Sequence, residues 1–153
     1  MTTPQQPKKP MLVSIMPDEA WEMLQADSSM IFVDIRSSGE FFFVGHPKGA
    51  THVAWVDEPD WVVNSNFVND VRRVAQNKLD TLENQSAMTV EQVPILLICR
   101  SGHRTLDAGK LLCDSGFTKV YNALEGFEGP LDEERHRGTL GGWRYYNLPW
   151  EQC

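Results

Sequence analysis

The fold is decided by the stretch PILLICRSGHRT, which occupies residues 94–105. Its first part, Ile95–Ile98, is short and wholly apolar, as expected of a strand buried on both faces. The strand ends at Cys99, and Gly102 then allows a sharp turn that other residues resist. A helical pattern follows at residues 103–115. In open α/β sheets, sites form at the carboxyl ends of strands, so we expect the chemistry of this protein at Cys99.

The rest of the chain alternates short apolar runs with helical patterns. Pro17 suits the first position of a helix, and apolar residues at helical spacing predict another helix over residues 66–78. Residues 81–93 are polar and irregular, which predicts a loop. We expect further strands at residues 11–15, 30–35, 52–56 and 119–122. Strands that alternate with helices over short connections predict a mostly parallel α/β sheet.

Composition and charge narrow the class of protein. The chain has 153 residues, of which 41% are hydrophobic and 23% charged, a balance typical of a soluble globular protein. Its net charge of −7 argues against nucleic acid as a partner. No apolar run is long enough to cross a membrane, and no secretory signal opens the chain, so we expect a cytoplasmic protein without a membrane partner. We expect a flexible tail at residues 1–10 and one domain at residues 11–153.

The cysteines and histidines exclude two kinds of site. Cys99, Cys113 and Cys153 are odd in number and irregular in spacing, which fits neither a disulfide framework nor a zinc site. The histidines show no ligand spacing either, so we expect no metal. Cys113 lies within a helical pattern, and we expect its side chain to pack in the core. Cys153 is the last residue of the sequence. Cys99 is therefore the candidate nucleophile.

The loop after Cys99 is suited to attract an anion. Amide N–H groups that point inward, together with the positive end of the following helix, would form a concave anion site. That field favours the thiolate, which is the reactive form of cysteine. The flanking side chains of Arg100 and Arg104 are expected to hold an oxyanion such as a sulfonate. We predict a substrate-binding loop that comprises Arg100, Ser101, Gly102, His103 and Arg104.

Several fragments, taken in order, resemble the single-domain rhodaneses, a family of sulfurtransferases that form a cysteine persulfide. The resemblance spans roughly residues 14–150 and implies a central, mostly parallel five-stranded sheet with helices on both faces. The matching fragments are V-D-I-R at 33–36 with Glu40 and Phe41 downstream, G-H-P-K-G-A at 45–50, C-R-S-G-H-R at 99–104, and a closing segment that includes L-E-G at 124–126, Trp143 and Pro149.

The sequence departs from the family pattern in two places. In the turn at 45–50, Pro47 and Lys48 stand where the family has an aliphatic residue followed by proline, so we expect a different backbone there. Residues 127–142, from Phe127 to Gly142, are an insertion that carries the charged run 132–137. Its glycines and prolines predict an irregular loop. Two roles stay open for this insertion, a side wall over Cys99 that selects substrates and a solvated surface loop.

The resemblance implies transfer of sulfane sulfur without a metal or organic cofactor. Cys99 would take the outer sulfur of thiosulfate or a related anion, release sulfite, and pass the sulfur to cyanide, a thiol or a sulfur-accepting protein. Outside the loop, the resemblance implies that Arg36 and Glu40 support the site. We expect Asp34 and Arg36 to form a structural polar network, and His46 to hold backbone in place rather than move a proton.

Two alternatives stay open. A persulfide relay or partner-binding rhodanese module would carry the same motif, although non-catalytic modules often lack the cysteine. A cysteine phosphatase or arsenate reductase uses a similar anion nest, but it needs one residue more between cysteine and arginine. Here only the four residues Arg100 to His103 separate Cys99 from Arg104, and this smaller loop favours a sulfur atom over a tetrahedral phosphate.

Overall fold

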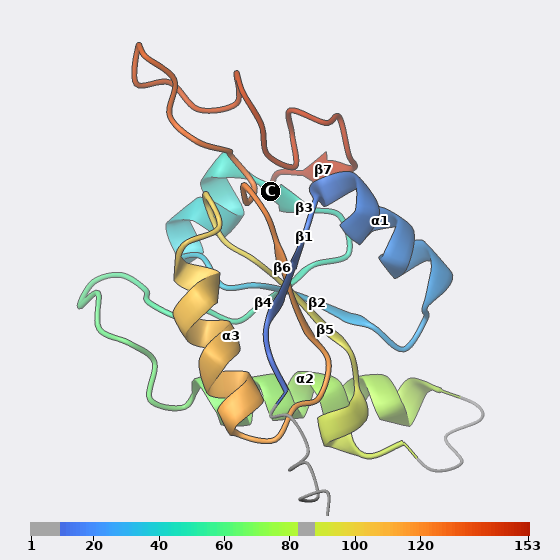
Figure 1. The fold of residues 1–153 in the computed structure, drawn as a ribbon. Helices are drawn as coiled ribbons and strands as arrows, with labels where there is room; N and C mark the ends of the chain where they lie inside the picture. Colours follow the sequence, from blue (N-terminus) through green and yellow to red (C-terminus); the bar gives the residue numbers. More distant parts are fainter. Residues whose placement is uncertain (1–9, 83–87) are drawn as a thin grey trace, which may run out of the picture.

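A five-stranded parallel sheet forms the centre of the protein, as predicted (Figure 1). The computed structural model describes residues 10–82 and 88–153, so residues 1–9 of the predicted tail and the middle of the predicted loop 81–93 lie outside it. All neighbours in the sheet run parallel. The strand order is β1 (Val13–Ile15), β6 (Val120–Ala123), β5 (Ile95–Ile98), β2 (Ile31–Asp34) and β4 (Thr51–His52).

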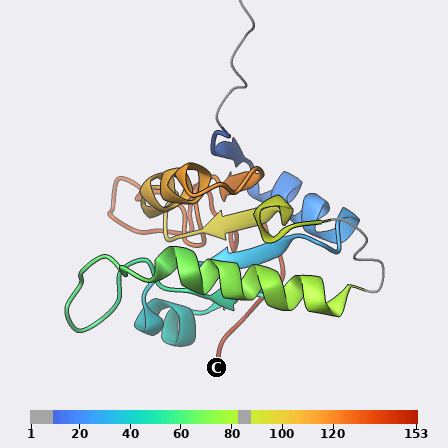
Figure 2. The same ribbon diagram turned by 90° about the horizontal axis from the view of Figure 1, so that it is seen from below.

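Helices cover both faces of the sheet (Figures 1 and 2). On one face, α2 (Phe67–Thr81) and α3 (Arg104–Asp114) pack against the buried side chains of alternate strand residues, such as Ile95 and Leu97. On the other face α1 (Pro17–Ala26) packs with Leu96 and its neighbours. Because successive strand residues point to opposite faces, a central strand buried on both sides must be apolar throughout, and β5 is.

Four short elements complete the described part of the chain, namely two short helical turns and two strands. A π-helical turn at Glu40–Val44 follows β2, and a single 3-10 turn at Val90–Gln92 lies in the predicted loop before β5. A small antiparallel pair joins β3 (His46–Pro47) to β7 (Trp150–Glu151). The insertion at residues 127–142 contains turns and bends without helix or strand, as its glycines and prolines predict. Within the described residues, no helix is long and apolar enough to span a membrane.

The edge strand β4 differs from the prediction of a strand at residues 52–56. It begins one residue earlier and has only two residues, Thr51 and His52. Beyond it the amides of Val53 and Trp55 still donate to the carbonyl oxygens of Asp34, the last residue of β2, and of Ile35, which follows it. The carbonyl of Trp55, however, accepts the amide of Asn64 instead of extending a ladder. An edge strand has a neighbour on one side only, so its length depends on such local competition.

Candidate active site

Cys99 lies directly after β5, at the carboxyl end of the central strand. Its side chain is only 1% exposed. The sulfur accepts a hydrogen bond from the amide of Gly102 at 3.2 Å, and it lies 3.6 Å from the hydroxyl oxygen of Thr105 in the first turn of α3. Gly102 has φ +95°, a left-handed conformation that explains the need for glycine. The sulfur therefore sits at the amino-terminal end of a helix, where the helix dipole favours negative charge.

A chain of hydrogen bonds that joins buried Thr105 and Asn122 to Ser14 lies next to the sulfur. The hydroxyl of Thr105 donates to Oδ1 of Asn122 at 2.6 Å, and Nδ2 of Asn122 donates to the hydroxyl oxygen of Ser14 at 3.2 Å. With its proton directed at Asn122, the oxygen of Thr105 faces the sulfur as an acceptor. Sequence reasoning missed this chain, although Asn122 inside an apolar strand is a detectable signal, because a buried amide needs partners.

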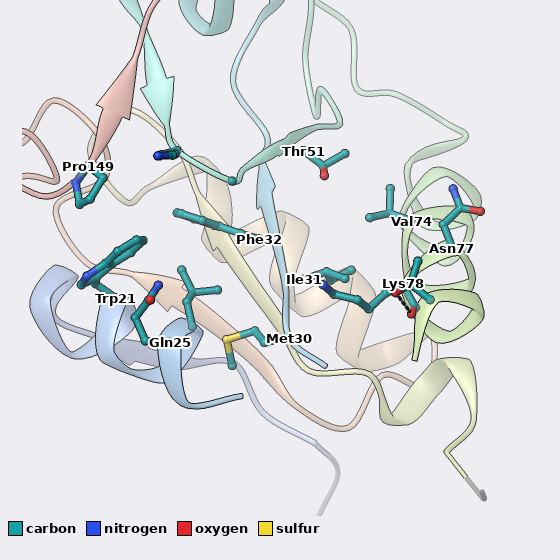
Figure 3. Close-up of a pocket in the computed structure, with 14 residues that line it drawn as sticks. Trp21, Gln25, Met30, Ile31, Phe32, Thr51, Val74, Asn77, Lys78 and Pro149 are labelled. Carbon is teal, nitrogen blue, oxygen red and sulfur yellow. Dashed lines mark hydrogen bonds between the residues drawn. The ribbon is translucent and has the colours of Figure 1, made fainter. Parts of the chain in front are cut away.

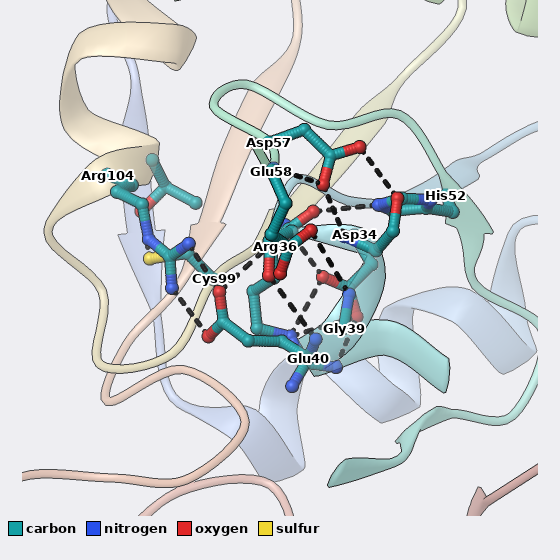
Figure 4. Close-up of polar contacts among 12 residues, drawn as sticks. Asp34, Arg36, Gly39, Glu40, His52, Asp57, Glu58, Cys99 and Arg104 are labelled. Atoms are coloured by element: carbon teal, nitrogen blue, oxygen red, sulfur yellow. Dashed lines mark hydrogen bonds and ion pairs between the residues drawn. The ribbon is translucent and has the colours of Figure 1, made fainter. Parts of the chain in front are cut away.

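Arg104 is engaged by a carboxylate from another part of the chain. Its two terminal nitrogens donate to the two oxygens of Glu40, at 2.7 and 2.8 Å (Figure 4). Burial raises the pKa of Glu40, but the hydrogen bonds and charge of Arg104 outweigh that effect, and the net pKa lies below its ordinary 4.5. Glu40 therefore binds a residue of the loop that follows Cys99. The two terminal nitrogens of Arg104 donate to this carboxylate of the protein itself.

Asp34 and Arg36 form a fully buried ion pair at the carboxyl end of β2. The Arg36 guanidinium donates to both oxygens of Asp34, at 2.7 Å for the shortest contact, and also to the carbonyl oxygen of Gly45 at 2.6 Å. Its remaining nitrogen, Nη1, has no hydrogen-bond partner among the described residues, and the guanidinium lies 4.4 Å above the ring of Phe127. This arrangement ties the end of β2 to the base of the insertion.

The histidines near β2 hold backbone in place. Nδ1 of His46 donates to the carbonyl oxygen of Phe41 at 2.9 Å, and the two rings stack at 3.9 Å. His52, which the sequence analysis did not single out, places Nε2 at 2.7 Å from the carbonyl oxygen of Arg36 (Figure 4). Neither histidine lines the cavity at Cys99. Both imidazoles are thus bound to main-chain carbonyl oxygens.

Cys99 forms the floor of a cavity of about 350 Å³, and the insertion forms one wall of it. An adjoining cavity of about 550 Å³ shares three of its arginines, Arg100, Arg104 and Arg137. All five predicted loop residues except Gly102 face the first cavity. Its lining consists of Cys99, Arg100, Ser101, His103, Arg104, Pro130, Leu131 and Arg137.

A cavity of about 750 Å³, larger than these two, lies elsewhere. It is at the edge of β2 between α1 and α2, where Trp21 and Phe32 face Val74 and Lys78 (Figure 3). Its lining includes no cysteine, histidine or arginine. We therefore place the candidate active site at Cys99. Among the described residues, no group of three or more histidine, cysteine or acidic side chains is arranged to hold a metal ion.

Comparison with known proteins agrees with this fold. The model of the rhodanese-like domain matches residues 16–132 of the chain. The chain belongs to the rhodanese-like family. Its curated relatives include the uncharacterized protein RP600 of Rickettsia prowazekii, which is 28% identical over 139 residues (87% of this chain and 92% of that protein). They also include the thiosulfate sulfurtransferase GlpE of Haemophilus influenzae, 28% identical over 120 residues (75% and 84%).

A solved structure extends the similarity over nearly the whole chain. Rv0390 of M. tuberculosis is 35% identical, with a TM-score of 0.74, and the match covers 94% of this chain and 99% of that one. The match to the rhodanese-like domain itself ends at residue 132, inside the insertion, so Arg137 lies beyond it. The wall of the Cys99 cavity is thus built partly from residues outside the match to the rhodanese-like domain.

The other two cysteines of this rhodanese-like protein lie away from the cavity. Cys113 is buried in α3, and burial together with the charge of Asp114 raises the pKa of its thiol. Cys153 is exposed, and its thiol donates to the carbonyl oxygen of Phe42 at 2.9 Å. A raised pKa leaves less thiolate at neutral pH, which makes Cys113 a poor nucleophile.

Proposed function

We propose that this rhodanese-like protein is a sulfurtransferase that moves sulfane sulfur from thiosulfate or a related anion to a thiophilic acceptor through a persulfide on Cys99. The observation that carries the proposal is the position of Sγ, which accepts the amide of Gly102 at the floor of a cavity lined by arginines. The name of the Haemophilus influenzae relative, a thiosulfate sulfurtransferase, supports the same reaction class.

The first half-reaction transfers sulfur to the protein. The thiolate of Cys99 attacks the outer sulfur of thiosulfate, and a new S–S bond forms. The original S–S bond breaks, and its electron pair leaves with sulfite. The negative charge stays on the outer sulfur of the persulfide, where an N–H donor and the amino-terminal end of α3 stabilise it. Cationic side chains at the cavity hold the sulfonate group before and after the bond breaks.

The second half-reaction returns the protein to its starting state. Cyanide attacks the outer sulfur of the persulfide, leaves as thiocyanate, and regenerates the thiolate of Cys99. With a thiol acceptor, the product is the persulfide of that thiol. Because the protein carries a covalent intermediate between two substrates, we expect ping-pong kinetics.

Intact-mass measurement after incubation with thiosulfate tests the proposal. The wild-type protein is expected to gain one sulfur atom, and to lose it as thiocyanate when cyanide is added. Cys99→Ser should gain none, because a hydroxyl is a poor nucleophile without an adjacent base, while Cys113→Ser serves as the matched control and should behave as wild type.

The alternatives predict different outcomes. Wild-type protein that gains no sulfur from thiosulfate and hydrolyses p-nitrophenyl phosphate would overturn the proposal in favour of a cysteine phosphatase. A persulfide relay module would load Cys99 but turn over only with a protein acceptor. Turnover with cyanide or a small thiol therefore distinguishes a free-standing sulfurtransferase from a relay.

A further inference from the structure

The insertion brings a third arginine to the cavity of Cys99. Arg137 lines this cavity together with Pro130 and Leu131, and it also lines the adjoining one. Its Nη1 donates to the carbonyl oxygen of Gly129 at 2.8 Å, which fixes the side chain against the root of its own loop. Arg135 lies two residues away and lines neither cavity.

The side chains that can carry a positive charge dominate the lining of this cavity. Three arginines and His103 line it, and none of the described aspartates or glutamates does, although the whole chain has a net charge of −7. Arg104 is already bound to both oxygens of Glu40. Within the described residues, neither Arg100 nor Arg137 lies within ion-pair distance of a carboxylate. These two arginines are therefore the cations that remain for an anionic ligand.

Nearby carboxylates of the adjoining cavity are engaged with other groups. Glu128 lies 3.7 Å from a guanidinium nitrogen of Arg144. Glu58 accepts the amide of Gly39 at 3.4 Å. An incoming anion would therefore be attracted to the side of the cavities that holds Cys99, and away from the side that holds these two acidic residues.

Hydrogen bonds hold the insertion in one conformation. The carboxylate of Asp132 accepts the amides of Glu134 and His136 at 2.9 and 2.8 Å, and the hydroxyl of Thr139 at 2.7 Å. The pKa of Asp132 is lowered, first by the hydroxyl of Thr139 and then by the amide of His136.

The base of the insertion is bonded to the catalytic loop itself. The amides of Phe127 and Glu128 donate to the carbonyl oxygens of Cys99 and Arg100, at 2.8 and 2.9 Å. At the other end, the carboxylate of Glu125 accepts the amide of Gly142 at 2.8 Å. The position of the wall is therefore fixed relative to the sulfur.

We propose that Arg137 and Arg100 are the anion-binding pair of this site, and that through them the insertion selects organic thiol acceptors that carry a carboxylate. This inference rests on the sulfurtransferase function proposed above. The sulfonate of thiosulfate is one bond from the sulfur under attack, so it must lie against the catalytic loop. Arg137 extends along both cavities and suits an acid group several bonds from the thiol, while Pro130 and Leu131 suit the carbon chain between them.

Two thiols of similar size test the proposal with thiosulfate as donor. 3-Mercaptopropionate carries a carboxylate, and 2-mercaptoethanol carries a hydroxyl. In Arg137→Gln, which keeps an N–H donor but loses the charge, kcat/KM for 3-mercaptopropionate should fall about tenfold or more, mainly through KM. The value for 2-mercaptoethanol should change little. Arg135→Gln is the matched control and should leave both values unchanged.

The outcomes separate this inference from the proposed function. An equal loss for both thiols, or no loss in Arg137→Gln, overturns the role of Arg137 while Cys99 still forms its persulfide. If no variant and no wild-type protein forms a persulfide, the proposed function itself fails. If Arg137→Gln melts early, Arg100→Gln decides, because among the described residues the Arg100 side chain has no hydrogen-bond partner. It should show the same loss of preference for the carboxylate, and an unchanged preference overturns the pair.

Discussion

The guanidinium of Arg104 and the carboxylate of Glu40 bind each other through two parallel hydrogen bonds, at 2.7 and 2.8 Å. The pair joins the start of α3 to the π-helical turn after β2. From sequence, Arg104 was expected to bind the sulfur donor directly. With both terminal nitrogens directed at Glu40, it acts first as a clamp that holds the catalytic loop.

The clamp predicts a specific loss of stability in acid. Because folding lowers the pKa of Glu40 below 4.5, the pair contributes its full stability above that pH and loses it as the pH falls through the folded pKa. Glu40→Gln removes this contribution, so its free energy of unfolding should depend less on pH below about 4.5 than that of wild type. Urea denaturation at a series of pH values measures the difference, and Glu19→Gln on the exposed surface of α1 is the control. Parallel pH curves for wild type and Glu40→Gln would contradict the clamp.

Gly126 should not tolerate a side chain. A Cβ there would lie 2.5 Å from the carbonyl oxygen of Cys99 and 2.5 Å from the carbonyl carbon of Arg100, and the residue has φ +66°. Gly126→Ala should lower the free energy of unfolding by about 2 kcal/mol or more, and slow persulfide formation, since the catalytic loop must shift. Gly138→Ala has a similar φ, +84°, but nothing within 4 Å, so thermal melting of the two variants separates the steric effect from the backbone strain. Equal losses in both variants would show that contact with the catalytic loop does not matter.

The hydroxyl of Thr105, which lies next to the sulfur of Cys99, should contribute to the stability of the folded protein. In Thr105→Val the buried oxygen of Asn122 loses its donor, which should cost about 1–3 kcal/mol of unfolding free energy. Thr105→Ser keeps the hydroxyl and should lose less than Thr105→Val, although it also removes a buried methyl group. Chemical denaturation of the three proteins tests this order. A Thr105→Val protein as stable as Thr105→Ser would mean that another group satisfies Asn122.

The parts of the fold that depend on local pattern could be predicted from the sequence. The strand Ile95–Ile98 was placed correctly because an unbroken apolar run needs no knowledge of its neighbours. The helix after it, and the left-handed Gly116 at its end (φ +109°), follow from periodicity and from the properties of glycine. The edge strand β4 was placed too long, because its end depends on competition for a single carbonyl.

The interactions of the site residues were harder to predict because they join distant segments. Glu40 and Arg104 are 64 residues apart, and no periodicity links them. The charged run 132–137 was recognised in the sequence, but of its residues only Arg137 lines the cavities. The direction of each side chain depends on the conformation of an irregular loop, which no periodicity predicts.

The two ends of the insertion meet at a narrow neck. Gly129 and Gly142 touch backbone to backbone, and neither position has room for a Cβ. Residues 130–141 therefore form a loop whose two ends lie next to each other, so the rest of the domain contacts both ends at nearly the same place. Loops of other lengths could close the same neck at small entropic cost. The strand β5, Cys99 and the pair of Glu40 and Arg104 all lie outside this segment, so a change in its length or sequence alters one wall of the cavity and leaves them in place.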